Sequence, residues 1–334
     1  MKSISNHIVL LDPGLQDNNR TPSFNLGDLI ISESNMNVLQ AIFPEKNIIR
    51  FSSHSFLSVH HRKTINSALY CFVGGSNLLH SDMLSQRIFL MRKGKLLWLF
   101  PCIKNLVLLG VGWGLGYKEN ITLRTKILYN NILHPDYIHS VRDGYTQAKL
   151  QYAINRNVIN TACTSMWGLN NTNSNLQVEP KKCLFTLTDY KQDKINDCQL
   201  ISFLLSRFSK LTFFPQGSND MGYISSLEIY KSNKSAIELL PHSYASFKEY
   251  IKNEEFVYIG TRLHAGIKCI DAGRKSIIIS IDHRSAEIAN DTFIPVVKRG
   301  EYTIISNWIE KKEVFNKPIQ IPLEDIEKWK TQFK

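Results

Sequence analysis

An arginine and a histidine stand two positions apart, where a predicted strand passes into a predicted helix. The strand is the apolar run Phe256–Ile259, and Thr261 after it is the expected N-cap of the helix. Apolar residues then recur at helical spacing as far as Gly273, and a second apolar strand follows. We therefore expect Arg262 and His264 in the first turn of a helix, at the carboxyl end of a strand.

This position suits the binding of a small anion. Ligands of doubly wound sheets bind at the carboxyl ends of the strands, and a helix N-terminus presents free N–H groups and the positive end of a dipole. The guanidinium of Arg262 suits carboxylate and phosphate groups, and the imidazole of His264 can serve as a general acid near neutral pH. The alternative interpretation is an arginine and a histidine exposed at a solvated helix start.

Two further predicted strand ends carry polar or flexible residues. Asn25 and Asp28 lie at the start of a long predicted helix, where Asp28 either complements the helix dipole or supplies a carboxylate that orients or deprotonates a hydroxyl. Gly75 and Ser76 follow an apolar strand, and glycine there allows backbone N–H groups to approach an oxyanion or a phosphate. An ordinary turn is the alternative for this second pair.

A second arginine, Arg142, follows another predicted buried strand. Two arginines on different domains suit a small dianion, because bidentate guanidinium contacts match carboxylate and phosphate geometry; an exposed ion pair between Arg142 and Asp143 is the alternative. The glycine-rich turn at 112–116 has the spacing G-x-G-x-G rather than G-x-G-x-x-G, so the sequence does not predict a dinucleotide site.

Strand and helix patterns alternate along both halves of the chain. This alternation predicts an α/β fold with two Rossmann-like domains, whose parallel sheets face each other across a cleft. The expected parts are a first domain at 1–168 that contributes Arg142, a polar linker at 169–180, a second domain at 181–310 with the anion site, and a C-terminal extension and helix at 311–334.

The composition restricts the class of function. The 334 residues carry a formal net charge of +11, spread along the chain, and no nucleic-acid-binding signature is present, so we expect no nucleic-acid partner. The six cysteines form no C-x-x-C pair, which predicts no disulfide framework and no metal site and favours a reduced, cytoplasmic protein. The basic and aromatic stretch Arg92–Phe100 is expected to be partly buried; the alternative is peripheral contact with an anionic surface at the inner face of the cell membrane.

Taken together, these motifs resemble the polysaccharide pyruvyl transferase family. They occur in the family's order over most of the chain, and the element that reads G-T-R-L-H-A is the most specific of them. The matching segments are Asn25–Asp28, Val73–Ser76, Gly110–Gly116, Ser140–Asp143, Pro215–Gln216 with the later Asp220, and Gly260–Ala265.

The resemblance implies a fold similar to that of GT-B glycosyltransferases. It also implies transfer of pyruvate from phosphoenolpyruvate to two hydroxyls of one sugar, which forms a cyclic ketal and releases phosphate. The partners implied are phosphoenolpyruvate as co-substrate, with no further cofactor, and a sugar or lipid-linked oligosaccharide as acceptor. The residues expected at the phosphoenolpyruvate site are Arg142, Arg262, Leu263, His264, Gly75 and Ser76.

The roles expected within this site follow from the chemistry of the reaction. His264 is the expected acid that protonates the methylene carbon of phosphoenolpyruvate, with Arg262 beside it. Asp28 is expected to bind or activate the acceptor, together with Asn25. Two alternatives stay open: a GT-B glycosyltransferase that uses a nucleotide sugar, and a non-enzymatic protein that binds a polyanion.

Overall fold

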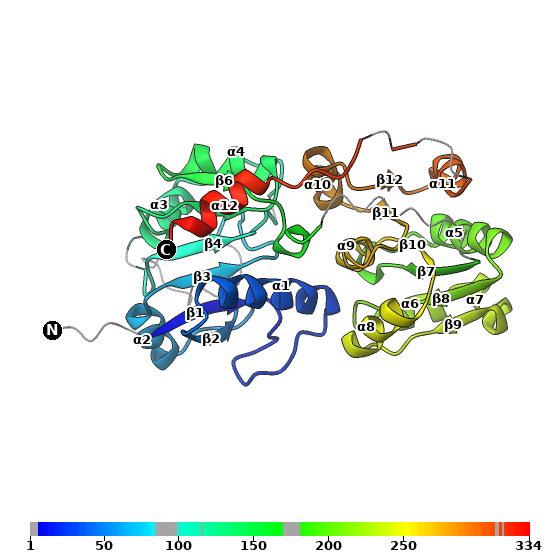
Figure 1. Ribbon diagram of the computed structural model, residues 1–334, viewed down its shortest axis with the longest axis horizontal. Helices are drawn as coiled ribbons and strands as arrows, with labels where there is room; N and C mark the ends of the chain where they lie inside the picture. The colour runs from blue at the N-terminus through cyan, green and yellow to red at the C-terminus, as the bar shows by residue number, and fades with distance from the viewer. Residues whose placement is uncertain are drawn as a thin grey trace. The chain divides into compact units, whose positions relative to one another are not determined.

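A computed structural model describes residues 6–83, 99, 101–114, 116–169, 181–310, 314–315 and 317–334. The chain divides into two compact units. The first unit comprises Met1–Ser23, Asp28–Trp167 and Ile321–Lys334, and the second comprises Phe24–Gly27 and Gly168–Gln320. The second unit is therefore an insertion in the first along the chain, and the final segment, red in Figure 1, returns to the unit in which the chain begins.

The first unit is built on parallel strands. These are β1 (His7–Asp12), β2 (Asn47–Ser52), β3 (Cys71–Gly74), β4 (Leu106–Leu109), β5 (His139–Val141) and β6 (Val158–Asn160). Four form a sheet in the order β2-β1-β3-β4, while β5 pairs with β6. The central strand β1 is fully buried from Ile8 to Leu11, which is why it is an unbroken apolar run.

Side chains connect β4 to β5 where the backbone ladder is incomplete. The N–H of Leu108 donates to Nδ1 of His139 at 3.3 Å, and the N–H of Gly110 donates to the hydroxyl of Ser140 at 2.8 Å. A bridge between Val111 and Val141 continues the pairing. The buried imidazole and hydroxyl thus satisfy strand N–H groups that would otherwise be left without acceptors.

Helices pack on the sheet of the first unit, as Figure 1 shows. The last helix along the chain contributes Trp329, and Phe333 follows it; their rings lie 5.8 and 5.2 Å from the ring of Phe72, between centroids. This end of the chain is therefore part of the core of the first unit. The helices are α1 (Leu26–Ile42), α2 (Val59–Ser67), α3 (Leu123–Ile132), α4 (Gly144–Ala153), the short 3-10 helix Thr164–Met166, and α12 (Leu323–Thr331).

The second unit has one parallel sheet of six strands. The strands are β7 (Lys182–Thr186), β8 (Lys210–Phe213), β9 (Ile237–Leu239), β10 (Val257–Gly260), β11 (Ser276–Ser280) and β12 (Val296–Lys298), in the order β12-β11-β10-β7-β8-β9. The order reverses direction between β10 and β7, so the loops after these two strands diverge at a switch point where ligands bind in sheets of this kind.

Seven helices are described in the second unit. They are α5 (Lys194–Arg207), α6 (Asp220–Ser225), α7 (Glu228–Ser232), α8 (Tyr244–Asn253), α9 (Leu263–Asp271), α10 (His283–Thr292) and α11 (Tyr302–Ile309), with 3-10 turns at Asp189–Lys191 and Lys234–Ala236. The buried rings of Phe185 and Phe213 lie 5.2 Å apart on neighbouring strands of the core.

The predicted α/β class with parallel sheets is confirmed. The predicted linker falls on residues 169–180 and the basic and aromatic stretch on residues 92–100; apart from Leu169 and Leu99, both lie outside the described residues.

Candidate functional site

The guanidinium of Arg262 is held by two carboxylates of the second unit. Its Nε donates to Asp220 Oδ2 at 3.0 Å and its Nη2 donates to Asp220 Oδ1 and, at 2.8 Å, to Asp189 Oδ1. The residue is only 5% exposed and acts as the N-cap residue of α9, so Thr261, the predicted N-cap, lies one position before the cap. Instead, the Thr261 hydroxyl bonds that of Thr188 at 2.8 Å.

Asp220 is fully buried and accepts bonds from the backbone as well as from the guanidinium. The N–H of Gly217 donates to its Oδ2 at 2.7 Å and the N–H of Asp189 to its Oδ1 at 3.1 Å. Burial raises the pKa of the Asp220 carboxyl above its ordinary value, while Arg262 and the two N–H groups act in the opposite direction. A Cβ at Gly217 would lie 2.2 Å from Arg262 Nη2, so glycine is what lets the guanidinium reach this position.

An exposed tyrosine covers the same arginine. The ring centroid of Tyr190 is 5.2 Å from Arg262 Cζ and 5.9 Å from Arg284 Cζ, and its hydroxyl accepts a bond from Arg284 Nη2. Arg284 also bonds Asp282, and this contact lowers the pKa of the Asp282 carboxyl although burial alone would raise it. The loops that follow β7, β8, β10 and β11 thus bring two arginines, an aromatic ring and three carboxylates to one edge of the sheet.

Gln216 connects the first turn of α9 to Asn25. Its Oε1 accepts from the N–H of Ala265 at 3.1 Å, and its Nε2 lies 3.3 Å from Asn25 Oδ1. Leu263 and His264 are the first two residues of α9, and both are 8% exposed. The predicted residues Asn25, Leu263 and His264 therefore lie with Arg262 around the start of α9.

Arg142 in the first unit is a buried guanidinium with one carboxylate partner. The residue is 2% exposed, its Nε donates to Asp143 Oδ2 at 3.2 Å, and Nη2 is buried without an acceptor in the part of the chain that the structure describes. The other oxygen of Asp143 accepts from the N–H of Thr146 at 2.7 Å and caps α4. A Cβ at Gly112 would lie 2.2 Å from Arg142 Cζ, so the glycine-rich turn makes room for the guanidinium.

Gly75 and Ser76 lie in a turn next to Gly112. Both have positive φ, 60° and 62°, and a Cβ at Gly75 would lie 2.3 Å from Ile31 Cγ2. The N–H of Gly75 donates to the carbonyl of Leu109 at 2.8 Å, and the N–H of Gly112 donates to the carbonyl of Ser76 at 2.8 Å. The N–H of Gly75 is therefore already used within the fold, while no bond to the Ser76 hydroxyl is found among the described residues.

Asp28 lies in the first turn of α1 and has polar neighbours in the first unit. The hydroxyl of Ser23 donates to its Oδ2 at 3.1 Å, and Nε2 of His54 lies 3.8 Å from the same oxygen. The imidazole of His54 also lies 3.2 Å from the carbonyl of Pro13. The carboxylate is therefore adjacent to an imidazole that the sequence did not single out.

The predicted residues thus fall into two groups. In the first unit Gly75, Ser76 and Arg142 meet around Gly112, while Asp28 lies with His54. In the second unit Asn25, Arg262, Leu263 and His264 gather at the start of α9.

Tyr190, which covers Arg262, was not predicted from the sequence, and neither were two polar neighbours of these groups, Asp189 and His54. Asp189 and His54 each lie within three residues of the end of a strand, and this position is the signal that could have identified them.

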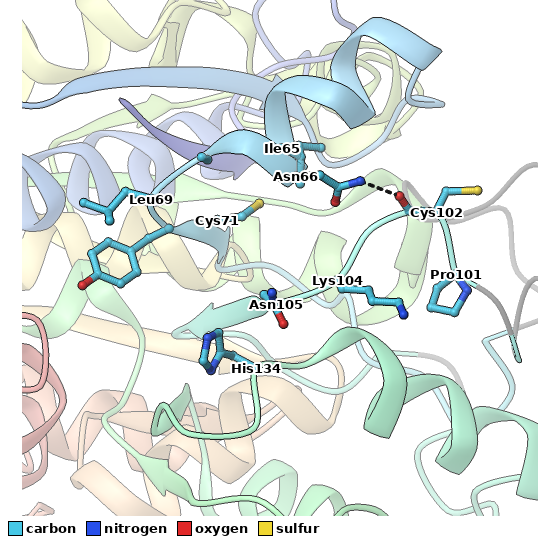
Figure 2. A pocket seen from close by; sticks show the side chains of 11 residues that line it. Ile65, Asn66, Leu69, Cys71, Pro101, Cys102, Lys104, Asn105 and His134 are labelled. Carbon is cyan, nitrogen blue, oxygen red and sulfur yellow. Dashed lines mark hydrogen bonds between the residues drawn. The ribbon is translucent and has the colours of Figure 1, made fainter. Parts of the chain in front are cut away.

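A cavity of about 310 Å³ in the first unit is not formed by these residues. It lies at the amino-terminal ends of β3 and β4, where Figure 2 shows Lys104, Asn105 and His134 around it. The dashed line in that figure is the bond from Asn66 Nδ2 to the carbonyl of Cys102, at 3.0 Å. Within this unit Gly75 and Ser76 follow the carboxyl end of β3, where ligands of such sheets bind, so the cavity lies at the opposite strand ends from these two residues.

The described residues include no group of three histidine, cysteine, aspartate or glutamate side chains that could hold a metal ion. Among the helices of the same residues, none has the length and apolar character needed to cross a membrane.

Comparison with known proteins identifies a family. A family model described as polysaccharide pyruvyl transferase matches residues 25–283. No curated protein was found to match this chain. Among solved structures, the crystal structure of UDP-GlcNAc 2-epimerase from Neisseria meningitidis bound to UDP-GlcNAc is similar, with a TM-score of 0.48 and 12% identity over 98% of this chain and 98% of that chain.

Proposed function

The chain belongs to the polysaccharide pyruvyl transferase family, and we propose that it transfers pyruvate from phosphoenolpyruvate to two hydroxyls of one sugar in a polysaccharide or its lipid-linked precursor. The products are a cyclic pyruvate ketal and phosphate. The observation that carries the proposal, beyond the family match, is the buried guanidinium of Arg142, whose Nη2 has no acceptor among the described residues.

A buried guanidinium nitrogen without an acceptor is costly, because the desolvation of a charged donor is not compensated. An anionic ligand removes this cost. Phosphoenolpyruvate carries a carboxylate and a phosphate, and both match guanidinium geometry. We assign Arg142 to this substrate, with the hydroxyl of Ser76 as a neighbouring contact. Gly75, whose N–H is bonded to the carbonyl of Leu109, shapes the turn that carries Ser76.

The start of α9 supplies the remaining proposed contacts. Nε and Nη2 of Arg262 are used by Asp220 and Asp189, so Nη1 is the nitrogen that this residue can offer to the substrate. His264 is the proposed acid: it gives a proton to the methylene carbon, and C2 becomes electrophilic. Leu263 is the proposed apolar contact between these two side chains.

The atoms of the reaction balance without a further co-reactant. A first sugar hydroxyl adds to C2, the C–O bond to phosphate breaks with its electron pair on phosphate, and the second hydroxyl closes the ketal. The two hydroxyls lose two protons: one replaces the proton that became part of the methyl group, and the other leaves with hydrogen phosphate. Asp28 and Asn25 are the proposed acceptor contacts.

The test is incubation of the protein with phosphoenolpyruvate and a panel of lipid-linked oligosaccharides, with phosphate release and product mass as readouts. The expected result is one phosphate released per ketal formed. In His264→Ala, kcat is expected to fall by about 10²–10⁴-fold, the usual contribution of a general acid. In Arg142→Gln, KM for phosphoenolpyruvate is expected to rise by at least tenfold, on the order of one lost charged hydrogen bond.

The control is Arg207→Gln, which removes an exposed ion pair with Glu310 and is expected to change neither constant. Thermal unfolding in the presence of ligands separates the alternative function. Protection by phosphoenolpyruvate supports the proposal. Protection by nucleoside diphosphates alone, with transfer of a sugar from a nucleotide sugar, would show a glycosyltransferase instead.

A further inference from the structure

The imidazole of His54 lies just beyond the end of β2 and next to a buried carboxylate. Its Nε2 is 3.2 Å from the carbonyl oxygen of Pro13 and 3.8 Å from Asp28 Oδ2. The side chain is 33% exposed, whereas that of Asp28 is 12% exposed. The ring is therefore partly exposed to solvent, and its Nε2 faces two oxygens.

The contact with Pro13 determines the tautomer of the neutral ring. A carbonyl oxygen can only accept a hydrogen bond, so Nε2 must carry the hydrogen. In the neutral imidazole the lone pair is then on Nδ1, and no hydrogen bond to Nδ1 is found among the described residues. His54 thus presents a basic nitrogen whose orientation is fixed by the opposite side of the ring.

Asp28 completes the arrangement. At 3.8 Å the carboxylate is too far for a hydrogen bond to Nε2, but it is close enough to compensate the positive charge that the ring acquires with a second proton. The Ser23 hydroxyl donates to the same carboxylate oxygen at 3.1 Å and fixes its position. In His54 the Pro13 carbonyl orients the imidazole, and the Asp28 carboxylate compensates the charge of its protonated form. Enzymes use a base held in this way to activate hydroxyl groups.

We infer that His54 is the base that removes the proton from the acceptor hydroxyl as this hydroxyl adds to C2 of the pyruvyl donor. The inference rests on the proposed function and names a residue that this proposal leaves open. The O–H bond of the sugar breaks, its proton passes to Nδ1 of His54, and its electron pair forms the new bond to C2. The imidazolium then returns the proton to solvent before the next turnover. Asp28, the proposed acceptor contact, thereby also positions His54.

The first experiment measures the tautomer by two-dimensional ¹H–¹⁵N NMR of the full chain labelled at histidine. The expected spectrum shows a protonated Nε2 and an unprotonated Nδ1 for the neutral ring of His54, assigned by its loss in His54→Gln. An Nδ1–H tautomer would overturn the inference, because the lone pair would then face Pro13 and Asp28. This readout does not depend on activity.

The second experiment compares His54→Ala, His54→Gln and the control His60→Gln in the ketal assay. Glutamine retains an N–H donor for the Pro13 carbonyl but has no basic atom, so a purely structural role predicts normal activity for His54→Gln. The inference predicts that kcat falls by about 10²-fold or more in both His54 variants, with KM for phosphoenolpyruvate within about threefold. Added imidazole is expected to restore part of the activity of His54→Ala, and His60→Gln is expected to behave as the wild type.

A kcat of His54→Gln within twofold of the wild type would overturn the inference while the proposed function stands. A wild-type protein that forms no ketal with any acceptor would instead refute the proposed function, and the tautomer measurement would still decide whether His54 has the geometry of a base. The two failures are therefore distinguishable.

Discussion

The guanidinium of Arg262 and the carboxylate of Asp220, 42 residues apart in sequence, form a buried bidentate pair at the edge of the sheet in the second unit. Asp220 is fully buried and Arg262 is 5% exposed. The pair connects the loop after β8 with the first turn of α9, so it fixes the element that carries His264.

Substitution of Asp220 by asparagine is expected to destabilise the second unit strongly. It leaves the Arg262 charge with Asp189 alone, and the loss of one partner of a buried ion pair costs about 3–5 kcal/mol. Urea denaturation measures this. The matched control is Glu228→Gln, which removes an exposed ion pair with Lys231 and is expected to cost less than about 1 kcal/mol. A change below about 1 kcal/mol for Asp220→Asn would show that the buried pair does not hold α9.

Substitution of Gly112 by alanine is expected to displace Arg142. The new Cβ would lie 2.2 Å from Cζ of the guanidinium, which must move. We expect KM for phosphoenolpyruvate to rise by roughly tenfold or more and the free energy of unfolding to fall by about 1–3 kcal/mol, the usual cost of overpacking.

The control for this substitution is Gly222→Ala. A Cβ at Gly222, inside α6, would meet no atom within 4 Å among the described residues beyond the backbone of its own helix, so alanine is expected to be neutral or stabilising there. Unchanged kinetics in Gly112→Ala, measured by phosphate release, would argue against Arg142 as a substrate contact.

Substitution of Gln216 by alanine is expected to loosen the first turn of α9. Ala265 loses the acceptor of its N–H, and an unsatisfied buried donor costs about 1–3 kcal/mol. We expect this loss of stability together with a decrease in kcat. Hydrogen exchange at Ala265 measures the local effect directly. Gln151→Ala, which removes only a bond to the carbonyl of Val158, serves as the control, and equal exchange at Ala265 in both variants would contradict the prediction.

The stability of the first unit is expected to fall in mild acid because of His139. Burial lowers the pKa of this imidazole from 6.5 to about 4. Between these values the unfolded chain binds a proton that the folded chain does not. The contribution of His139 to the free energy of unfolding is therefore full above pH 6.5 and is lost as the pH falls towards 4. The loss is about 3 kcal/mol in total.

Denaturation of His139→Gln at a series of pH values tests this expectation. The variant keeps a donor and an acceptor for the neighbouring backbone groups but cannot titrate. Between pH 4 and 6.5 the free energy of unfolding of the variant is expected to change less steeply with pH than that of the wild type. The difference in slope corresponds to about one proton bound on unfolding. His60→Gln, on the exposed face of α2, is expected to keep the wild-type slope. An unchanged slope in His139→Gln would mean that another group titrates in this range.

Much of the fold follows from local sequence patterns. Apolar runs such as Ile8–Leu11 and Val257–Ile259 are buried strands because both faces of a parallel sheet are covered, and a sequence shows this directly. The amphipathic helix that includes Trp329 was also expected, but not its place in the first unit. That place depends on contacts with Phe72, more than 250 residues away, which periodicity does not record.

The candidate site was predicted less completely, for a related reason. The strand-end rule identified Arg142 and Arg262, but the carboxylates that surround Arg262 come from loops after other strands, and their pairing depends on strand order. His54 was missed because it stands three residues after Phe51, in a stretch of serines without a helical pattern. Only the folded geometry brings it to Asp28.

The return of α12 to the first unit has a consequence for how the protein is made. Trp329 and Phe333 fill the core beside Phe72, and they are translated after the whole of the second unit. On the ribosome the second unit can therefore complete its core before the first does. Until α12 arrives, the nascent first unit exposes apolar surface around β3, and in this interval chaperones are expected to bind it.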